Sequence, residues 1–165
     1  MTSLAGYASI ILMASAFAQA QSNPPTAAES LGGSFADVNR KVLAMAKDFP
    51  EDKYNFRLKP EMRSFGEVIV HIASGNAYGA KAGRGEKVKW DELDAKNDPT
   101  KADIVALMEK TIADSTATLK QFPEGWRKSL EPFLSVTEHS AEHYGLLVAY
   151  YRANGLVPPE SRPKK

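Results

Sequence analysis

Apolar residues recur along the chain in steps of three and four, which is the spacing of one face of an α-helix. The first such segment spans residues 29–48, and Pro50 ends it. A second segment begins at Ser64, whose spacing to Glu67 is typical of a capping box, and continues to about Ala82. The apolar positions of the first segment are Leu31, Phe35, Val38, Val42, Met45 and Phe49.

Two further segments show the same period. The third is expected to open at Thr100 and to end at the Pro-Glu-Gly sequence of residues 123–125. The fourth is expected to begin near Glu131, with Pro132 in its first turn, and to end where Gly155 suits the left-handed position after a helix. The third segment's core-facing stripe is Ile104, Leu107, Met108, Ile112, Leu119 and Phe122, interrupted by Ser115.

These four segments, with no strand pattern and no internal repeat, predict an all-α fold. Four helices of about 20 residues joined by loops indicate a four-helix bundle, mostly antiparallel. The longest connection, residues 83–99, is a charged loop that contains Trp90, with a short turn expected at residues 90–93. Loops of this length in a compact domain are often functional.

The N-terminal segment differs from the rest of the chain. Residues 1–20 carry no charged side chain, and Ala18-Gln19-Ala20 fits a signal-peptidase site. We therefore expect a signal peptide over residues 1–20 with cleavage after Ala20, a disordered lead-in over residues 21–28, and the bundle domain over residues 29–165. The protein would be exported, periplasmic or secreted, without a stable membrane anchor after cleavage, because the apolar run is shorter than the ~20 residues of a membrane span.

Composition excludes one class of partner. Lys and Arg number 21 against 20 Asp and Glu, for a formal net charge of +1, and no basic stripe stands out. The electrostatic footprint of nucleic-acid binding is therefore missing. The absence of cysteine excludes disulfides. A small-molecule substrate remains the expected partner, and the sequence leaves open whether the bundle forms a homodimer.

The chain has three histidines, and all three fall on predicted inward helix faces. His139 and His143 are four residues apart, which places both imidazoles on one side of the fourth helix. His71 lies on the inward face of the second helix. A single inward histidine is more typical of a hydrogen-bonded core residue, but three without partners are costly to bury, and one divalent cation would satisfy them all. The pattern predicts a three-histidine metal site with an open position, and nitrogen-only ligands suit zinc, nickel, copper and iron.

Three nearby polar residues are candidate catalytic groups. Glu142 is close enough in helical phase to reach the site edge as a proton shuttle or hydrogen-bond an imidazole, although it also fits a solvated surface carboxylate. Glu67 lies one turn before His71 and fits best as the capping partner of Ser64, with a general base or a fourth metal ligand as the alternatives. Tyr150 could orient substrate or be an ordinary core tyrosine. Tyr78 and Trp90 are weaker candidates for the pocket wall.

The chain also resembles a known family. Residues 63–76 are similar to the second helix of the DinB/YfiT-like metalloenzymes, and residues 138–145 and 151–161 are similar to their last helix and its Gly-x-x-Pro-Pro ending. The resemblance covers residues 29–162. It implies a four-helix bundle that holds a divalent metal, often nickel or zinc, through the matching histidines 71, 139 and 143. It also implies thiol S-transferase or thiol-dependent isomerase chemistry in some relatives.

The expected export changes which reaction these residues favour. An oxidising compartment disfavours free thiol pools, so thiol transfer is a weaker expectation for an exported member. A metal-bound water requires no thiol, and we expect a metal-dependent hydrolase in which the three histidines hold the ion. A thiol S-transferase of the DinB type is the alternative enzyme. A non-catalytic metal-binding or structural bundle, and a plain bundle without metal, are the alternatives outside catalysis.

Overall fold

The computed structural model describes residues 24–121 and 127–163. In this part of the chain it has four α-helices and no strand: α1 (Ala27–Asp48), α2 (Phe65–Gly83), α3 (Lys101–Leu119) and α4 (Arg127–Ala153). Three short 3-10 helices complete it: η1 (Glu51–Lys53), η2 (Ala95–Asn97) and η3 (Pro159–Ser161). The all-α, four-helix expectation is confirmed. The expected signal peptide and the start of the lead-in lie outside the described residues.

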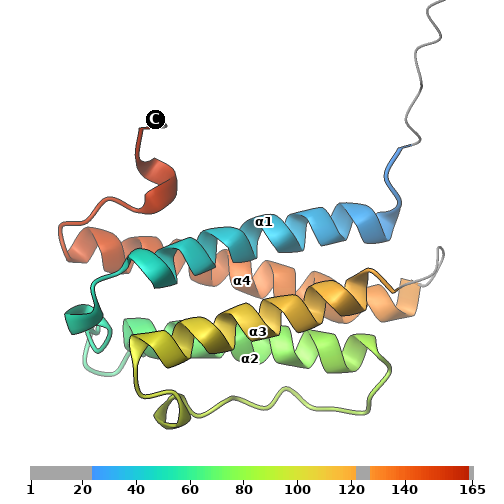
Figure 1. The fold of residues 1–165 in the computed structure, drawn as a ribbon, viewed down its shortest axis with the longest axis horizontal. Helices are drawn as coiled ribbons and strands as arrows, with labels where there is room; N and C mark the ends of the chain where they lie inside the picture. The colour runs from blue at the N-terminus through green and yellow to red at the C-terminus, as the bar shows by residue number, and fades with distance from the viewer. Residues whose placement is uncertain (1–23, 122–126, 164–165) are drawn as a thin grey trace, which may run out of the picture.

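The helices pack in two layers with a long return connection (Figure 1). α2 packs against α3 and α4, and α1 packs against the same two helices. α1 and α2 therefore lie diagonally opposite each other in the bundle. Figure 1 shows α2 antiparallel to α4 and α1 antiparallel to α3, whereas the α2–α3 and α1–α4 pairs run parallel. The parallel pairs qualify the mostly antiparallel expectation. They arise because the crossing loop (residues 84–100) returns along the full length of the bundle before α3 begins.

Capping boxes start three of the helices. Ser64 accepts from the Glu67 backbone N–H while the Glu67 side chain accepts from the Ser64 backbone, as the sequence predicted for α2. The same reciprocal pair joins Thr26 and Glu29, and it begins α1 at Ala27, two residues earlier than the apolar pattern predicted. The expected lead-in therefore already includes the first residues of α1.

The ends of α3 and α4 differ from expectation in two respects. α3 ends at Leu119, before the expected stop at residues 123–125, which lie outside the described residues. α4 begins at Arg127, so Pro132 lies beyond the first turn rather than in it. The end of α4 is as predicted, with Gly155 at φ +70°.

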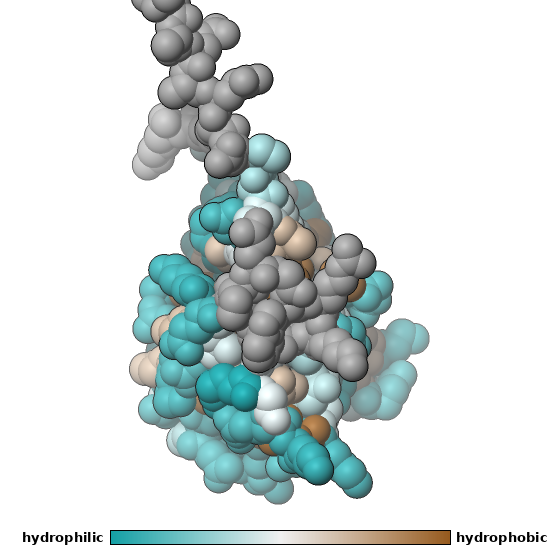
Figure 2. Space-filling view, turned by 90° about the vertical axis from the view of Figure 1, so that its right-hand side faces the viewer, coloured by the Kyte–Doolittle hydropathy of each residue, from teal (hydrophilic) through white to brown (hydrophobic). Residues whose placement is uncertain are grey.

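The buried apolar residues of the described chain form two clusters along the bundle, and the larger one is rich in aromatic rings. Phe49 at the end of α1 stacks on Phe65 at the start of α2, with ring centroids 3.8 Å apart. Tyr54 packs beside them and donates its hydroxyl to the Ala46 carbonyl oxygen. Figure 2, a view onto the end of the bundle where α1 begins, shows a largely hydrophilic exterior with scattered hydrophobic residues, as expected when the apolar faces are turned inward.

A buried polar cluster links α1, α2 and α3 within this core. Asn39 and Asn76 are fully buried, and the Asn76 amide donates to Asn39 Oδ1 at 2.8 Å. Ser115 donates to the Asn76 carbonyl oxygen at 2.8 Å. The serine that interrupts the apolar stripe of α3 is therefore a hydrogen-bonded contact between helices. These hydrogen bonds offset the cost of burying the two amides and the hydroxyl, while Asn76 Oδ1 is buried without a hydrogen-bond partner among the described residues.

The crossing loop is attached to the outer side of α2. Its short helix is η2 at Ala95–Asn97, whereas the sequence predicted a turn at residues 90–93. The Leu93 backbone N–H donates to Ser74 Oγ at 2.9 Å. This bond holds residues 90–93 extended against α2, and it places Trp90 and Glu92 beside the middle of the bundle. Along the described residues, no helix is long and apolar enough to cross a membrane.

Candidate metal centre

The three histidines meet between α2 and α4. His71 comes from the second turn of α2, and His139 and His143 come from successive turns of α4. The ring centroids form a triangle with sides of 4.6 Å (71–139), 4.7 Å (71–143) and 4.4 Å (139–143). One ligand nitrogen from each residue lies within 4.8 Å of the others, and all three residues are partly buried. The predicted convergence of the histidines is therefore present in the fold.

A carboxylate from the crossing loop orients the first of these rings. Glu92 Oε1 lies 2.8 Å from His71 Nδ1, and His71 Nε2 lies 2.9 Å from His139 Nε2. An ionised carboxylate can only accept a hydrogen bond, so this contact requires the proton of neutral His71 to be on Nδ1. The Nε2 lone pair of His71 then faces the centre of the triangle, where a ligand atom is needed.

Burial keeps the three imidazoles neutral at physiological pH. Desolvation, reinforced by the neighbouring rings of His143 and His71, lowers the pKa of His139 to about 4. Burial is also the largest cause of the lowered pKa of His71 and of His143, and the nearby Arg63 charge acts in the same direction on both. Neutral imidazole is the form that binds metal ions, so the site needs no deprotonation before it can bind one.

The donor set fits a divalent cation. Two nitrogens bound to one Zn²⁺ at about 2.1 Å each can be at most about 4.2 Å apart, so the observed spread closes with small side-chain rotations. His71 Nε2 and His139 Nε2 lie 2.9 Å apart, so one proton must stand between these rings unless a cation accepts both lone pairs. Nitrogen-only ligands suit zinc, nickel, copper and iron. His139 Nδ1 is buried and has no hydrogen-bond partner among the described residues.

Trp90 forms one wall of the centre. Its indole packs edge-on against the His139 ring with centroids 4.8 Å apart, and it lies beside Tyr78 at 5.3 Å. The indole occupies the space above Gly75, where a Cβ atom would lie 2.6 Å from Trp90 Cη2 and 3.2 Å from His139 Nδ1. The absence of a side chain at Gly75 therefore allows the Trp90 indole to pack against α2 beside His139.

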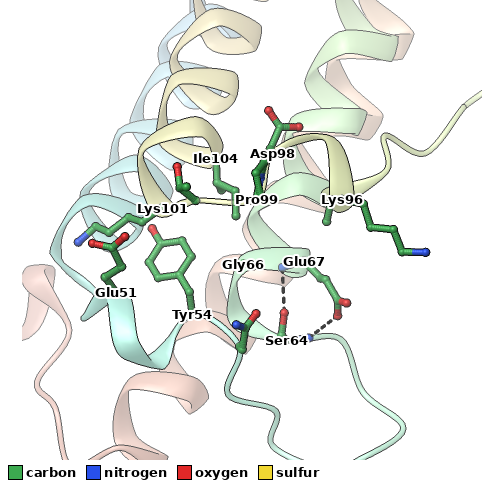
Figure 3. Close-up of a pocket in the computed structure, with 13 residues that line it drawn as sticks. Glu51, Tyr54, Ser64, Gly66, Glu67, Lys96, Asp98, Pro99, Lys101 and Ile104 are labelled. Carbon is green, nitrogen blue, oxygen red and sulfur yellow. Dashed lines mark hydrogen bonds between the residues drawn. The ribbon is translucent and has the colours of Figure 1, made fainter.

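Glu67 is engaged at the start of α2. Its carboxylate accepts from the Ser64 backbone N–H at 2.7 Å and pairs with Arg57 at 2.7 Å, and the hydrogen bond from Arg57 is the main cause of its lowered pKa. Figure 3 shows this capping box at the edge of a pocket of about 410 Å³ between the starts of α2 and α3. None of the three histidines lines that pocket. The observed contacts of Glu67 are therefore those of the capping partner of Ser64.

Tyr150 and Glu142 occupy different surroundings. Tyr150 is fully buried and donates its hydroxyl to the backbone carbonyl of Arg63, just before α2 begins. Burial raises the pKa of Tyr150, so it stays a donor. Glu142 is exposed on α4, and its charge opposes the lowering of the His143 pKa. Of the predicted catalytic candidates, Glu142 is the one whose carboxylate carries no hydrogen bond to another group in the described part of the chain.

Sequence reasoning missed Glu92 and Arg63. Arg63 Nη2 lies 2.8 Å from Glu92 Oε1 and 3.1 Å from Glu92 Oε2, so one carboxylate bridges a guanidinium and the His71 ring. Glu92 is one of many charged residues in an irregular loop, with no periodicity that would indicate its direction. The adjacent Trp90, a large aromatic in a polar loop, was the one signal that this segment packs against the bundle.

Fold and site together define a four-helix bundle with a three-histidine group between α2 and α4 that could hold a metal ion. The family model of the DinB superfamily matches residues 34–150, which include all three histidines and most of the bundle. The chain belongs to the DinB superfamily. A comparison with curated proteins gave no match.

Proposed function

We propose that the protein binds a divalent metal ion through His71, His139 and His143 and acts as a metal-dependent hydrolase on a small-molecule substrate. The observation that supports binding is the convergence of three neutral imidazoles, with one ligand atom of each inside a 4.8 Å limit. A cation held by three protein nitrogens retains open positions, where it would polarise a substrate oxygen or lower the pKa of water. Zinc or nickel is the proposed ion.

The side chains around the proposed ion have different roles. Glu92 accepts a hydrogen bond from His71 Nδ1, and Trp90 excludes water from one side of His139. Glu142 is an exposed carboxylate that directly precedes His143 and lies three residues after His139, and it is the candidate to receive and return a proton at the solvent edge. Tyr150 is occupied by the Arg63 carbonyl, so its contribution to substrate orientation would require that bond to open.

Hydrolysis is preferred over thiol transfer because of the expected export. We propose that residues 1–20 direct export and are removed after Ala20, and N-terminal sequencing of the mature protein from fractionated cells tests this. A mature chain that begins at Gln21 in the periplasm supports hydrolysis. An intact N-terminus in the cytoplasm, together with metal-dependent conjugation of a thiol to an electrophile, would instead support the thiol S-transferase alternative.

Metal analysis tests the binding step. The protein is purified without chelator, and its metal content is measured before and after dialysis against Zn²⁺ or Ni²⁺. We expect about one ion per chain and a rise in thermal stability with free metal, by about 2.7 kcal/mol at 100 times the dissociation constant. Less than about a tenth of an ion per chain with no uptake would refute the site.

Activity assays test the chemistry. Metal-loaded protein is mixed with panels of esters, amides and phosphoesters, alongside His143→Ala and the exposed α4 variant Glu131→Ala as a matched control. Hydrolysis lost in His143→Ala and kept in Glu131→Ala supports the proposal. Hydrolysis unchanged in His143→Ala contradicts the mechanism, and metal uptake without turnover of any panel supports a non-catalytic metal-binding bundle.

A further inference from the structure

The carboxylate of Glu92 links three parts of the chain that are far apart in sequence. It contacts the His71 ring from α2 and the Arg63 guanidinium that precedes α2, although 21 and 29 residues separate these partners from it. The crossing loop fixes this carboxylate through two further contacts. The Leu93 backbone N–H donates a hydrogen bond to Ser74 Oγ at 2.9 Å, and the Trp90 indole packs against Gly75.

We propose that Glu92 is a positioning residue for the metal centre, one that acts through His71 by holding its proton on Nδ1 and directing its Nε2 toward the ion. This inference rests on the proposed metal-binding function. Its geometric basis is the line of contacts from Arg63 to Glu92 to His71 Nδ1, with His71 Nε2 on the opposite side of the ring facing His139. A carboxylate that accepts from the distal nitrogen of a ligand histidine fixes its tautomer and increases its basicity.

Exposure distinguishes this role from a general contribution to stability. The Glu92 side chain is 46% exposed, whereas the His71 side chain is 14% exposed. Ion pairs as exposed as Glu92 with Arg63 contribute little to folding, because water and salt screen them. Loss of Glu92 should therefore leave the bundle folded and change mainly the orientation and protonation of His71. Arg63 restrains the carboxylate by contacting both of its oxygens.

The tautomer of His71 is directly observable in the protein without metal. The chain has three histidines, so selective ¹⁵N labelling gives a spectrum with few signals, and the signal lost in His71→Asn assigns residue 71. In the full chain at neutral pH we expect His71 to be protonated on Nδ1. In Glu92→Ala this single form is lost and Nε2 protonation increases, since no acceptor holds the proton on Nδ1.

Metal affinity supplies the second readout. Competition titrations with Co²⁺ should show binding 10–100-fold weaker in Glu92→Ala, roughly the usual effect of removing an outer partner of a ligand histidine. Asp91→Ala is the matched control, because it removes the adjacent exposed carboxylate of the same loop. It should bind Co²⁺ as the wild type does. Glu92→Gln keeps an oxygen that can accept from Nδ1, and it should retain the tautomer and recover part of the affinity.

The outcomes separate this inference from the function on which it rests. If the wild-type protein binds no Co²⁺, the proposed metal site is wrong, whichever nitrogen of His71 carries the proton. Wild-type protein that binds Co²⁺, with equal affinity in folded Glu92→Ala, overturns the positioning role alone. A His71 ring protonated on Nε2 in the wild type also overturns it. Circular dichroism of each variant establishes that the bundle is folded.

Discussion

The indole of Trp90 lies directly against the backbone of Gly75, at a position where any larger residue would collide with it. A Cβ atom on residue 75 would be 2.6 Å from Trp90 Cη2. Glycine in the interior of a helix costs up to about 1 kcal/mol relative to alanine. The contact therefore indicates that α2 accommodates an unfavourable helix residue where the crossing loop packs beside the histidines.

The Gly75–Trp90 contact predicts a strong coupling between the two positions. Gly75→Ala should displace Trp90 and lower the free energy of unfolding, whereas the same change in a Trp90→Ala background should cost less, because the collision is gone. Urea denaturation of the four proteins in the cycle should give an interaction energy of roughly 1 kcal/mol. The control is Gly145→Ala in α4, where a Cβ meets nothing within 4 Å. It should be neutral or stabilising, and additive behaviour at 75 and 90 would contradict the prediction.

Glu67 is predicted to support stability more than chemistry. Glu67→Ala removes one side of the capping box of α2 and the ion pair with Arg57. The free energy of unfolding should fall by about 1 kcal/mol, the typical effect of a lost cap. Glu67→Gln can still cap and should lose less, and both variants should keep their metal affinity. Urea denaturation and Co²⁺ titration measure the two effects, and a loss of turnover with unchanged stability in Glu67→Gln would restore the general-base alternative.

Tyr150 is predicted to act through the segment that leads into α2. Tyr150→Phe removes the hydroxyl that donates to the Arg63 carbonyl, at an expected cost of about 1 kcal/mol in unfolding free energy. Tyr144→Phe, a partly buried position on the same helix, should cost less and is the matched control. Thermal denaturation distinguishes them. A Tyr150→Phe protein with wild-type stability but altered substrate affinity would support the substrate-orienting alternative instead.

We predict that protonation of the Asp48 carboxylate lowers the free energy of unfolding at acidic pH. Arg162 forms a two-pronged ion pair with its carboxylate, with nitrogen–oxygen distances of 2.8 and 2.5 Å, and this pair is the first cause of the lowered pKa of Asp48. Because the pKa is lower in the folded protein than its ordinary value of 3.8, the contribution is present above pH 3.8 and is lost as pH falls through the folded pKa.

The corresponding measurement compares urea midpoints across pH. Asp48→Asn should be less stable than the wild type at neutral pH, and the difference should shrink as the pH falls below 3.8. Asp52→Asn makes the same change at an exposed position of η1 and should show a smaller difference at neutral pH. A wild-type advantage over Asp48→Asn that stays constant with pH would contradict the assignment.

The helices and the histidine cluster follow closely from local sequence. The i, i+4 spacing of His139 and His143 puts them on one helix face whatever surrounds it, and the Ser64–Glu67 box defines where α2 begins. The missed early start of α1 has the same kind of origin, because Thr26 and Glu29 form an equally local box that the apolar pattern did not include. Local hydrogen bonds and helical phase are properties of neighbouring residues, so the sequence determines them.

Tertiary structure decided which groups surround those histidines. The direction of Glu92 depends on a loop that crosses the whole bundle, and its register is set by a Ser74 bond and by the space above Gly75. No periodic pattern encodes such contacts, because they join residues about 20 positions apart through an irregular backbone. The sequence by itself thus determined a helical bundle with three inward histidines. The packing of the loop on α2 decided that Glu92 and Trp90 are their neighbours, while Glu67 is engaged by Ser64 and Arg57.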